Sequence, residues 1–233
     1  DGQIDSLAER LNLIISYAGF PNYRDFAHRH RGRFDYSPED CLSFHDAIEQ
    51  EMVPLLRELH DERQTALGIE SVRPWDTATD PKGHSPLKPF EEVSQLIHRT
   101  QAIFDQLDGE LASWFQAMQD LDLLDLANRK GKAPGGYQDS LAEARLPFIF
   151  MNAVGVQRDV ETLLHEAGHA FHTMASQKES LHSYRHAPIE FCEVASMAME
   201  LLGGEYLGEF YNTEEVRRAR IAHLEASFSC SRG

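Results

Sequence analysis

Residues 165–172 combine side chains that can bind a metal with one that can move a proton. They read HEAGHAFH, so four positions separate His165 from His169, and Glu166 lies between them. Residues at i and i+4 share one face of a helix, so both imidazoles can reach a single metal ion. A glutamate beside them can take a proton from water bound to that metal. The pattern therefore predicts a zinc site suited to hydrolysis, with Glu166 as the base.

The sequence around this motif predicts the helix that the motif requires. No proline interrupts residues 159–177, and apolar residues recur there at helical spacing. At 100° per residue, His165 and His169 lie opposite this apolar stripe and therefore do not face the core. They could also face solvent without binding a metal, which is the competing interpretation. The predicted helix is Asp159–Ser176, and its stripe comprises Val160, Leu163, Leu164, Ala167, Phe171 and Met174.

A catalytic zinc site needs a third protein ligand and one open position. His172 lies almost two helical turns beyond His165, about 10.5 Å, and is too far away to share its metal. Phe171 and Ala175 stand where a metzincin would have glycine and histidine, so that class is excluded.

The remaining source of a ligand is the predicted helix Pro188–Leu202, PIEFCEVASMAMELL. Glu193, Ser196 and Glu200 share one face of it, and large apolar residues share the other. Glu190 and Glu193 follow His169 by 21 and 24 positions, and spacing alone leaves both open as ligands. A solvated acidic face without a metal is the alternative interpretation of this helix.

The rest of the chain predicts a mainly α fold with a small β-sheet near the active site. Residues 68–89 have the proline and glycine content of an irregular connection, and residues 130–137 that of a turn-rich loop. Leu146–Met151 is the best strand candidate, with a partner near Gly136. Pro54 should kink the helix that starts at Ser37. The other predicted helices are Ile4–Ala18, Phe90–Asn128 and Thr213–Glu225, the last capped by Thr213.

Composition excludes some partners and indicates a compartment. Hydrophobic residues make up 42% and charged residues 26% of the 233 residues, which is typical of a globular protein. A formal net charge of −16 argues against binding to nucleic acid or to an anionic membrane. No apolar run reaches the roughly 18 residues of a membrane-spanning helix. The three cysteines are scattered and odd in number, which favours a cytoplasmic location.

HEAGHAFH followed by PIEFCEVASMAMELL resembles the M3 family of zinc metallopeptidases, and its oligoendopeptidase F branch more than thimet oligopeptidase. RKGKAPGGY, which starts at Arg129, is also similar to that branch, and the likeness is strongest over residues 129–202. The resemblance implies a zincin-type catalytic domain within a two-lobed channel architecture. It divides the chain into a helical portion, 1–128, and a zinc-site portion, 129–233. Together they would form a single domain, 1–233, that is a piece of a longer protein.

The resemblance also assigns roles to individual residues. It selects Glu193 as the third zinc ligand and makes Glu190 a partner for a metal-bound imidazole. Gly135, Gly136 and Tyr137 resemble an edge that pairs with an extended peptide substrate. The alternative for that loop is a plain hairpin turn. His186 corresponds to a histidine of the loop before the ligand glutamate.

The function implied is that of a zinc-dependent endopeptidase that cleaves short oligopeptides. One Zn²⁺ per chain would activate water together with Glu166. The family has a further histidine and several tyrosines well beyond the ligand glutamate, and this chain has no such segment before Gly233. Two alternatives remain: a gluzincin aminopeptidase, and a non-catalytic or truncated helical domain with a degenerate zinc site.

Overall fold

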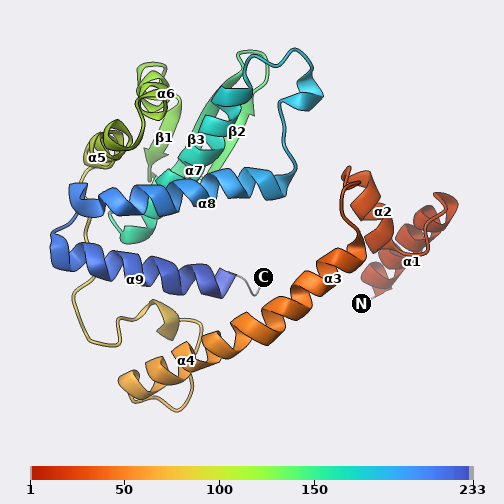
Figure 1. Ribbon diagram of the computed structural model, residues 1–233, viewed down its shortest axis with the longest axis horizontal. Helices are drawn as coiled ribbons and strands as arrows, with labels where there is room; N and C mark the ends of the chain where they lie inside the picture. Colours follow the sequence, from red (N-terminus) through yellow and green to blue (C-terminus); the bar gives the residue numbers. More distant parts are fainter. Residues whose placement is uncertain (1, 231–233) are drawn as a thin grey trace. The chain divides into compact units, whose positions relative to one another are not determined.

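The computed structural model describes residues 2–230, apart from the side chains of residues 2–6, 78 and 228–230. Two compact units form, one from residues up to Lys82 and the other from Gly83–Ala226, while the chain from Ser227 onward groups with the first. Most of the described residues are helical, and a single small sheet lies in the second unit (Figure 1). The predicted mainly α fold with a small sheet is confirmed.

The first unit contains four helices whose boundaries follow local signals. Ser37 caps the third of them, because its Oγ accepts the N–H of Asp40 at 3.1 Å while its own N–H donates to Asp40 Oδ2 at 2.8 Å. A π-helical segment, Ile48–Met52, lies directly before the helix that carries Pro54 in its first turn, and the kink expected at Pro54 stays a prediction. The helices are α1 (Gly2–Tyr17), α2 (Tyr23–His30), α3 (Pro38–Ala47) and α4 (Val53–Leu67).

The second unit places three strands among five helices. β3 lies between the other two strands, parallel to β1 and antiparallel to β2. Alternate residues of β3 are buried, as expected for a strand with one face on the core. The elements are α5 (Val93–Leu107), α6 (Gly109–Asp120), β1 (Leu124–Ala127), β2 (Tyr137–Leu141), β3 (Leu146–Ala153), α7 (Gln157–Ser176), α8 (Ile189–Gly203) and α9 (Thr213–Cys230).

The strand predicted at Leu146–Met151 and its partner near Gly136 are confirmed, but two other predictions are wrong. Helix does not continue to Asn128, because Asp122 adopts a left-handed φ of 53° and the chain then pairs with β3 as β1. The last helix is capped by Asn212 rather than Thr213: Asn212 Oδ1 accepts the N–H groups of Glu214 and Glu215, both at 3.1 Å. That helix also runs beyond the predicted end at Glu225.

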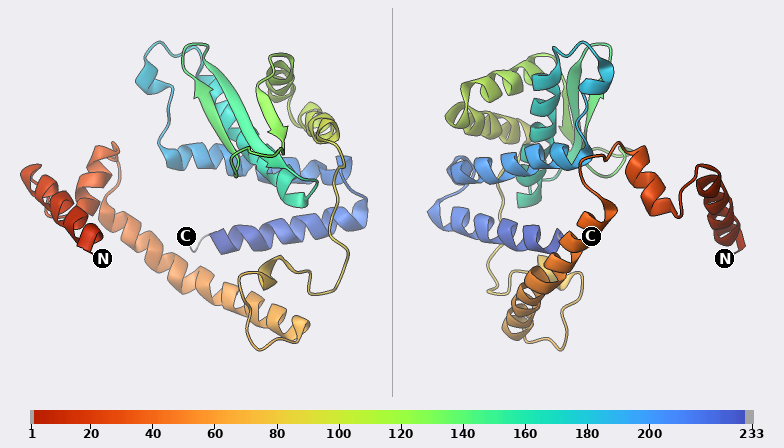
Figure 2. Two further views of the ribbon diagram at one scale, coloured as in Figure 1. Left: turned by 180° about the vertical axis from the view of Figure 1, so that it is seen from behind. Right: turned by 45° about the vertical axis from the view of Figure 1, so that its right-hand side comes forward.

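α7 is the central element of the second unit. It packs against β2 and β3 on one side and against α8 on another (Figure 2). Its start is fixed by Asp159, whose Oδ2 accepts three backbone N–H groups at 2.8–3.0 Å, from Val154, Gly155 and Val156. The apolar face of α7 joins the core, in which Phe104 contacts both Phe115 and Phe171. The sheet and the core therefore hold α7 rigidly, and its other face is available to carry a site.

Candidate metal centre

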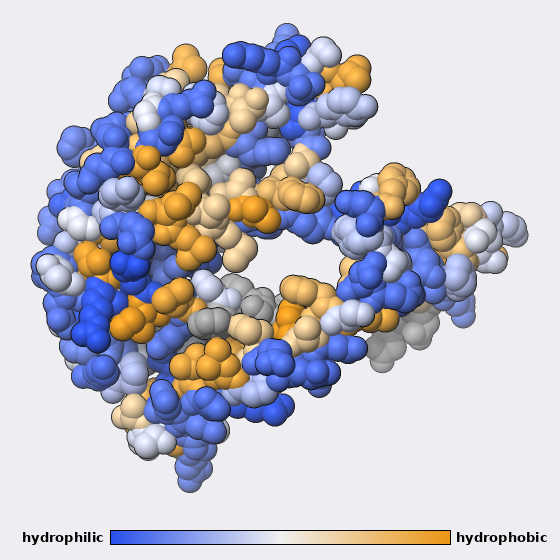
Figure 3. All heavy atoms as spheres, in the orientation of Figure 1, coloured by the Kyte–Doolittle hydropathy of each residue, from blue (hydrophilic) through white to orange (hydrophobic). Residues whose placement is uncertain are grey.

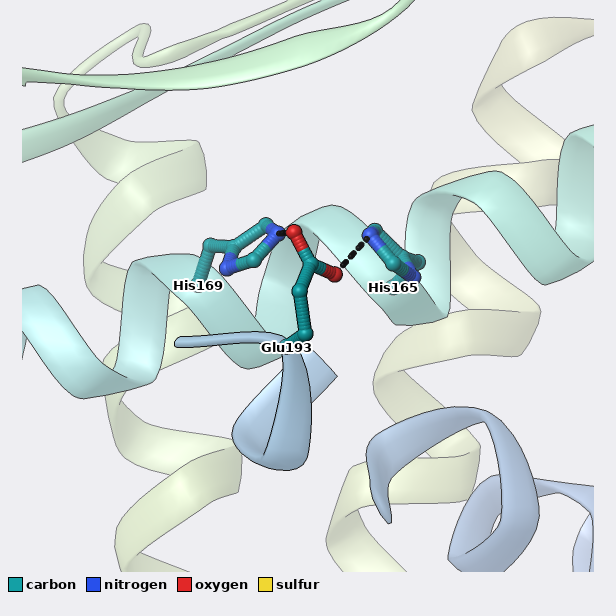
Figure 4. Close-up of side chains that lie close together, drawn as sticks. All are labelled: His165, His169 and Glu193. Atoms are coloured by element: carbon teal, nitrogen blue, oxygen red, sulfur yellow. Dashed lines mark ion pairs between the residues drawn. The ribbon is translucent and has the colours of Figure 1, made fainter. Parts of the chain in front are cut away.

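The two histidines of α7 and one glutamate of α8 converge on one point. Glu193 Oε2 lies 3.3 Å from His165 Nε2, and its Oε1 lies 3.7 Å from His169 Nε2 (Figure 4). The histidines are one helical turn apart, with ring centroids separated by 4.9 Å. These three residues form a group whose ligand atoms all lie within 4.8 Å of one another.

This group has the chemistry and spacing of a catalytic zinc site. Zn²⁺ bonds of about 2.0–2.2 Å at tetrahedral angles place neighbouring ligand atoms roughly 3.3–3.6 Å apart. The two nitrogen-to-oxygen distances, 3.3 and 3.7 Å, are close to this range. Two imidazoles and a carboxylate leave a fourth position open, and 41% of the Glu193 side chain is exposed to solvent. The residues therefore fit zinc with room for a further ligand.

A close crossing of α7 and α8 brings Glu193 to the histidines. A Cβ at Gly168 would lie 2.5 Å from Ser196 Cα and 2.6 Å from Ala195 O, so only glycine allows this approach. Ser196 is fully buried at the crossing, and its Oγ donates to Glu193 Oε2 at 2.9 Å. The sequence analysis placed Ser196 on the polar face of this helix but gave it no role.

The partner of the first histidine is Glu200. Its Oε1 lies 2.6 Å from His165 Nδ1, which leaves the Nε2 of that ring directed toward Glu193. This hydrogen bond raises the pKa of His165, whereas burial lowers the pKa of His169. Glu190, for which we predicted the role of partner, is exposed in the first turn of α8, and that role stays a prediction.

Glu166 lies in a cavity beside the ligand group. The cavity has a volume of about 400 Å³, and His165 and Glu200 also line it. Only 7% of Glu166 is exposed, and this burial raises the pKa of its carboxyl group. The backbone N–H of Gln138, on β2, acts in the opposite direction and ties the carboxylate to the sheet. A proton acceptor thus stands next to the three metal-binding side chains, within a space that a substrate could enter.

Comparison with known proteins places this arrangement in a family. The model of peptidase family M3 matches residues 3–228. The chain belongs to peptidase family M3.

Similar M3 relatives have names that agree with the resemblance found in the sequence. Oligopeptidase PepF of Bacillus subtilis (strain 168) is 29% identical over 177 residues, which cover 76% of this chain and 26% of the relative. The chromosomal oligoendopeptidase F of Lactococcus lactis subsp. cremoris is 27% identical over 186 residues, covering 78% of this chain and 30% of the relative. The predicted likeness to oligoendopeptidase F is confirmed.

A solved structure extends the similarity to the fold. PZ peptidase A, determined with an inhibitor, superposes with a TM-score of 0.87 at 29% identity. The match covers 97% of this chain and 40% of that structure. The M3 chain described here therefore spans well under half the length of these three proteins. Among its described residues, no helix combines the length and apolar character needed to cross a membrane.

The other predicted site residues of this M3 chain lie around the start of β2 and in the loop before α8. Gly135 and Gly136 line the cavity of Glu166, and Asn152 Nδ2 holds their loop by donating to Gly135 O at 3.0 Å. Tyr137 is half exposed and stacks on Phe150 with ring centroids 5.0 Å apart. His186 is exposed in the loop before α8, where its ring contacts His182 at 5.2 Å.

The polar side of α8 in this M3 chain is partly buried. Ser196 is fully buried and only 13% of the Glu200 side chain is exposed, whereas 41% of the Glu193 side chain is exposed, so the face is not fully solvated. The large apolar residues of α8 instead lie at the surface, and Figure 3 shows hydrophobic side chains over this helix. The exposed residues are Phe191, Val194, Met197, Leu201 and Leu202.

Proposed function

We propose that this chain carries the zinc site of a metalloendopeptidase that hydrolyses short oligopeptides. The observation that carries the proposal is the convergence of His165, His169 and Glu193 beside the buried Glu166. Membership of family M3 and the names of its relatives support peptides as the substrate class. The chain spans a minor part of those relatives, so peptide hydrolysis by this chain is part of the proposal.

The proposed chemistry divides between the ligands and the base. Nε2 of His165, Nε2 of His169 and the carboxylate of Glu193 would hold one zinc ion. When bound, zinc supplies a positive charge that polarises the scissile carbonyl and acidifies water. Glu166 takes a proton from the attacking water and then delivers it to the leaving amine. Its buried position keeps bulk water from competing for that proton.

The sheet suggests how a peptide would lie in the site. Among the described strands, β2 pairs only with β3, so its other edge is open to an extended chain. The cavity beside β2 is lined by Gly135, Gly136 and Glu166. A Cβ at Gly136 would lie 3.1 Å from the side chain of Thr162, so a larger residue there would crowd the cavity wall. A peptide that added a strand at this edge would pass close to the base.

The test compares the parent chain with Glu193→Ala and Glu166→Gln. We expect about one zinc per chain in the parent and in Glu166→Gln, and much less in Glu193→Ala, by elemental analysis. Glu166→Gln should lower the rate of peptide cleavage by about 10²–10⁴-fold, because it removes the base and keeps the ligands. Peptides blocked at both ends should be cleaved internally.

Three results would contradict parts of this proposal. Equal zinc in the parent and in Glu193→Ala would place the third ligand elsewhere, with Glu190 the next candidate. Cleavage that requires a free amino terminus would indicate an aminopeptidase. Failure of the parent to bind added zinc would make the domain non-catalytic.

A further inference from the structure

A histidine that belongs to neither sequence motif lies close to Glu200, the carboxylate that contacts His165. The Nδ1 atom of His223, on α9, lies 3.6 Å from Glu200 Oε2 and 3.8 Å from Glu161 Oε1, within ion-pair range but beyond the length of a hydrogen bond. Only 14% of its side chain is exposed, and both glutamate side chains are similarly buried. Three helices therefore contribute to one buried polar cluster: α7 through Glu161, α8 through Glu200 and α9 through His223.

The two carboxylates of this cluster differ in how they are held. Glu161 already has partners on its own helix, with Gln157 Nε2 at 3.0 Å and Arg158 NH1 at 3.5 Å. Glu200 instead has one oxygen on His165 Nδ1, at 2.6 Å, and its other oxygen toward His223. A buried carboxylate needs a partner for each oxygen if it is to keep one orientation. His223 Nδ1 lies within ion-pair range of that other oxygen and can serve as its partner through electrostatic attraction.

We propose that His223 is a positioning residue for the proposed metal site and acts through Glu200. By fixing the second oxygen of Glu200, it fixes the first oxygen against His165 and thereby the direction of His165 Nε2. The inference rests on the proposed zinc site, because it describes how one of its ligands is oriented. His223 itself is not a ligand: the group of potential metal-binding residues found among the described residues consists of His165, His169 and Glu193.

The test uses three variants of the full 233-residue chain. His223→Ala removes the contact with Glu200. His223→Asn keeps an N–H donor close to the place of Nδ1. Arg220→Ala is the matched control, because Arg220 lies about one turn earlier on α9 and its variant also loses a carboxylate partner, the exposed Glu205. For each variant we would measure the zinc Kd by chelator competition, the visible spectrum of the Co²⁺-substituted protein, and the metal-free Tm.

Partners of metal-binding histidines typically contribute 10–100-fold to metal affinity. His223 acts on His165 through Glu200 and does not contact it directly. We therefore expect His223→Ala to raise the zinc Kd by about 10-fold, the low end of that range. The Co²⁺ bands should change in position or intensity, since they report the geometry of the ligands. His223→Asn should restore most of the affinity and the spectrum, and Arg220→Ala should match the parent.

Each other outcome overturns the inference. A parent-like Kd and spectrum in His223→Ala would show that Glu200 needs no help from α9. An equal loss in His223→Asn, or in Arg220→Ala, would point to a general effect on α9 rather than to the contact with Glu200. Failure of the parent to bind zinc would overturn the proposed metal site and this inference together, whereas normal binding in both the parent and His223→Ala would overturn this inference alone.

Discussion

At the residue scale, the hydroxyl of Ser196 contacts Glu193, the proposed third zinc ligand. It donates to Glu193 Oε2 at 2.9 Å from a fully buried position at the crossing of α7 and α8. Ser196→Ala removes this donor without adding volume, so we expect a normal fold and a zinc affinity lower by about 10-fold. Titration with a competing chelator measures the effect. Ser113→Ala, which loses a hydroxyl contact to a backbone carbonyl on α6, is the control. Unchanged affinity in Ser196→Ala would mean that the helix backbone alone orients Glu193.

Sequence reasoning identified the proposed ligands, but it did not identify the residues that contact and orient them. His165, Glu166 and His169 follow from helical spacing, and the resemblance to a family selected Glu193 over Glu190. Glu200 and Ser196 were placed on the correct face, yet their contacts depend on how two helices cross, which spacing on one helix does not encode. His223 has no motif around it, and only the packing of α9 brings it to Glu200. Residues that act through tertiary contacts were therefore the ones missed.

At the scale of elements, the crossing of α7 and α8 depends on one glycine. A Cβ at Gly168 would overlap the backbone of Ser196 at 2.5 Å, and helix backbone cannot shift as easily as a flexible side chain. We expect Gly168→Ala to push the helices apart, at a cost of about 1–3 kcal/mol of stability, and to lose zinc binding. Urea unfolding and zinc analysis measure the two effects. Gly204→Ala, where a Cβ would meet nothing within 4 Å, is the control. If Gly168→Ala bound zinc like the parent, the close crossing would not be needed for the site.

Elements with strong local signals were predicted, and elements defined by distant partners were not. α3 has its serine cap and β3 its short apolar run with β-branched and aromatic residues, and both were found from sequence. β1 was read as helix because its four residues follow two helices, and its strand form depends on parallel pairing with β3, more than twenty residues later. The packing of α8 was ambiguous for a related reason. A helix with one polar and one apolar face is expected to bury the apolar face, but here the large apolar residues of α8 are exposed, whereas Ser196 on the polar face is fully buried.

At the scale of the whole molecule, Asp125 makes the stability of the folded protein depend on pH. Hydrogen bonds from Arg129, and then from Lys132, lower the pKa of Asp125 from 3.8 to about 2. A carboxyl group with a lowered pKa in the folded state stabilises that state above its unfolded pKa, and this stabilisation is lost as pH falls toward 2. Asp125→Asn should therefore reduce stability at neutral pH and flatten its decline between about pH 4 and 2. Thermal unfolding across that pH range provides the measurement, and parallel curves for both proteins would contradict the assignment.

The division of the chain is also a property of the whole molecule. The compact units of the structure divide in the sequence between Lys82 and Gly83, whereas the predicted helical portion ends at residue 128. The single catalytic domain stays a prediction, since the matched relatives are much longer than this chain.

Lys132 joins β1 to β3 from inside the protein. Its Nζ donates to backbone oxygens of Asp125 at 2.9 Å and of Ala127 at 3.0 Å, it also contacts Met151 O, and only 1% of its side chain is exposed. Lys130, two positions earlier, is exposed. An amine-modifying reagent that labels Lys130 at once can reach Lys132 only when the two strands separate. The delay between labelling of Lys130 and labelling of Lys132 therefore measures how often β1 and β3 separate.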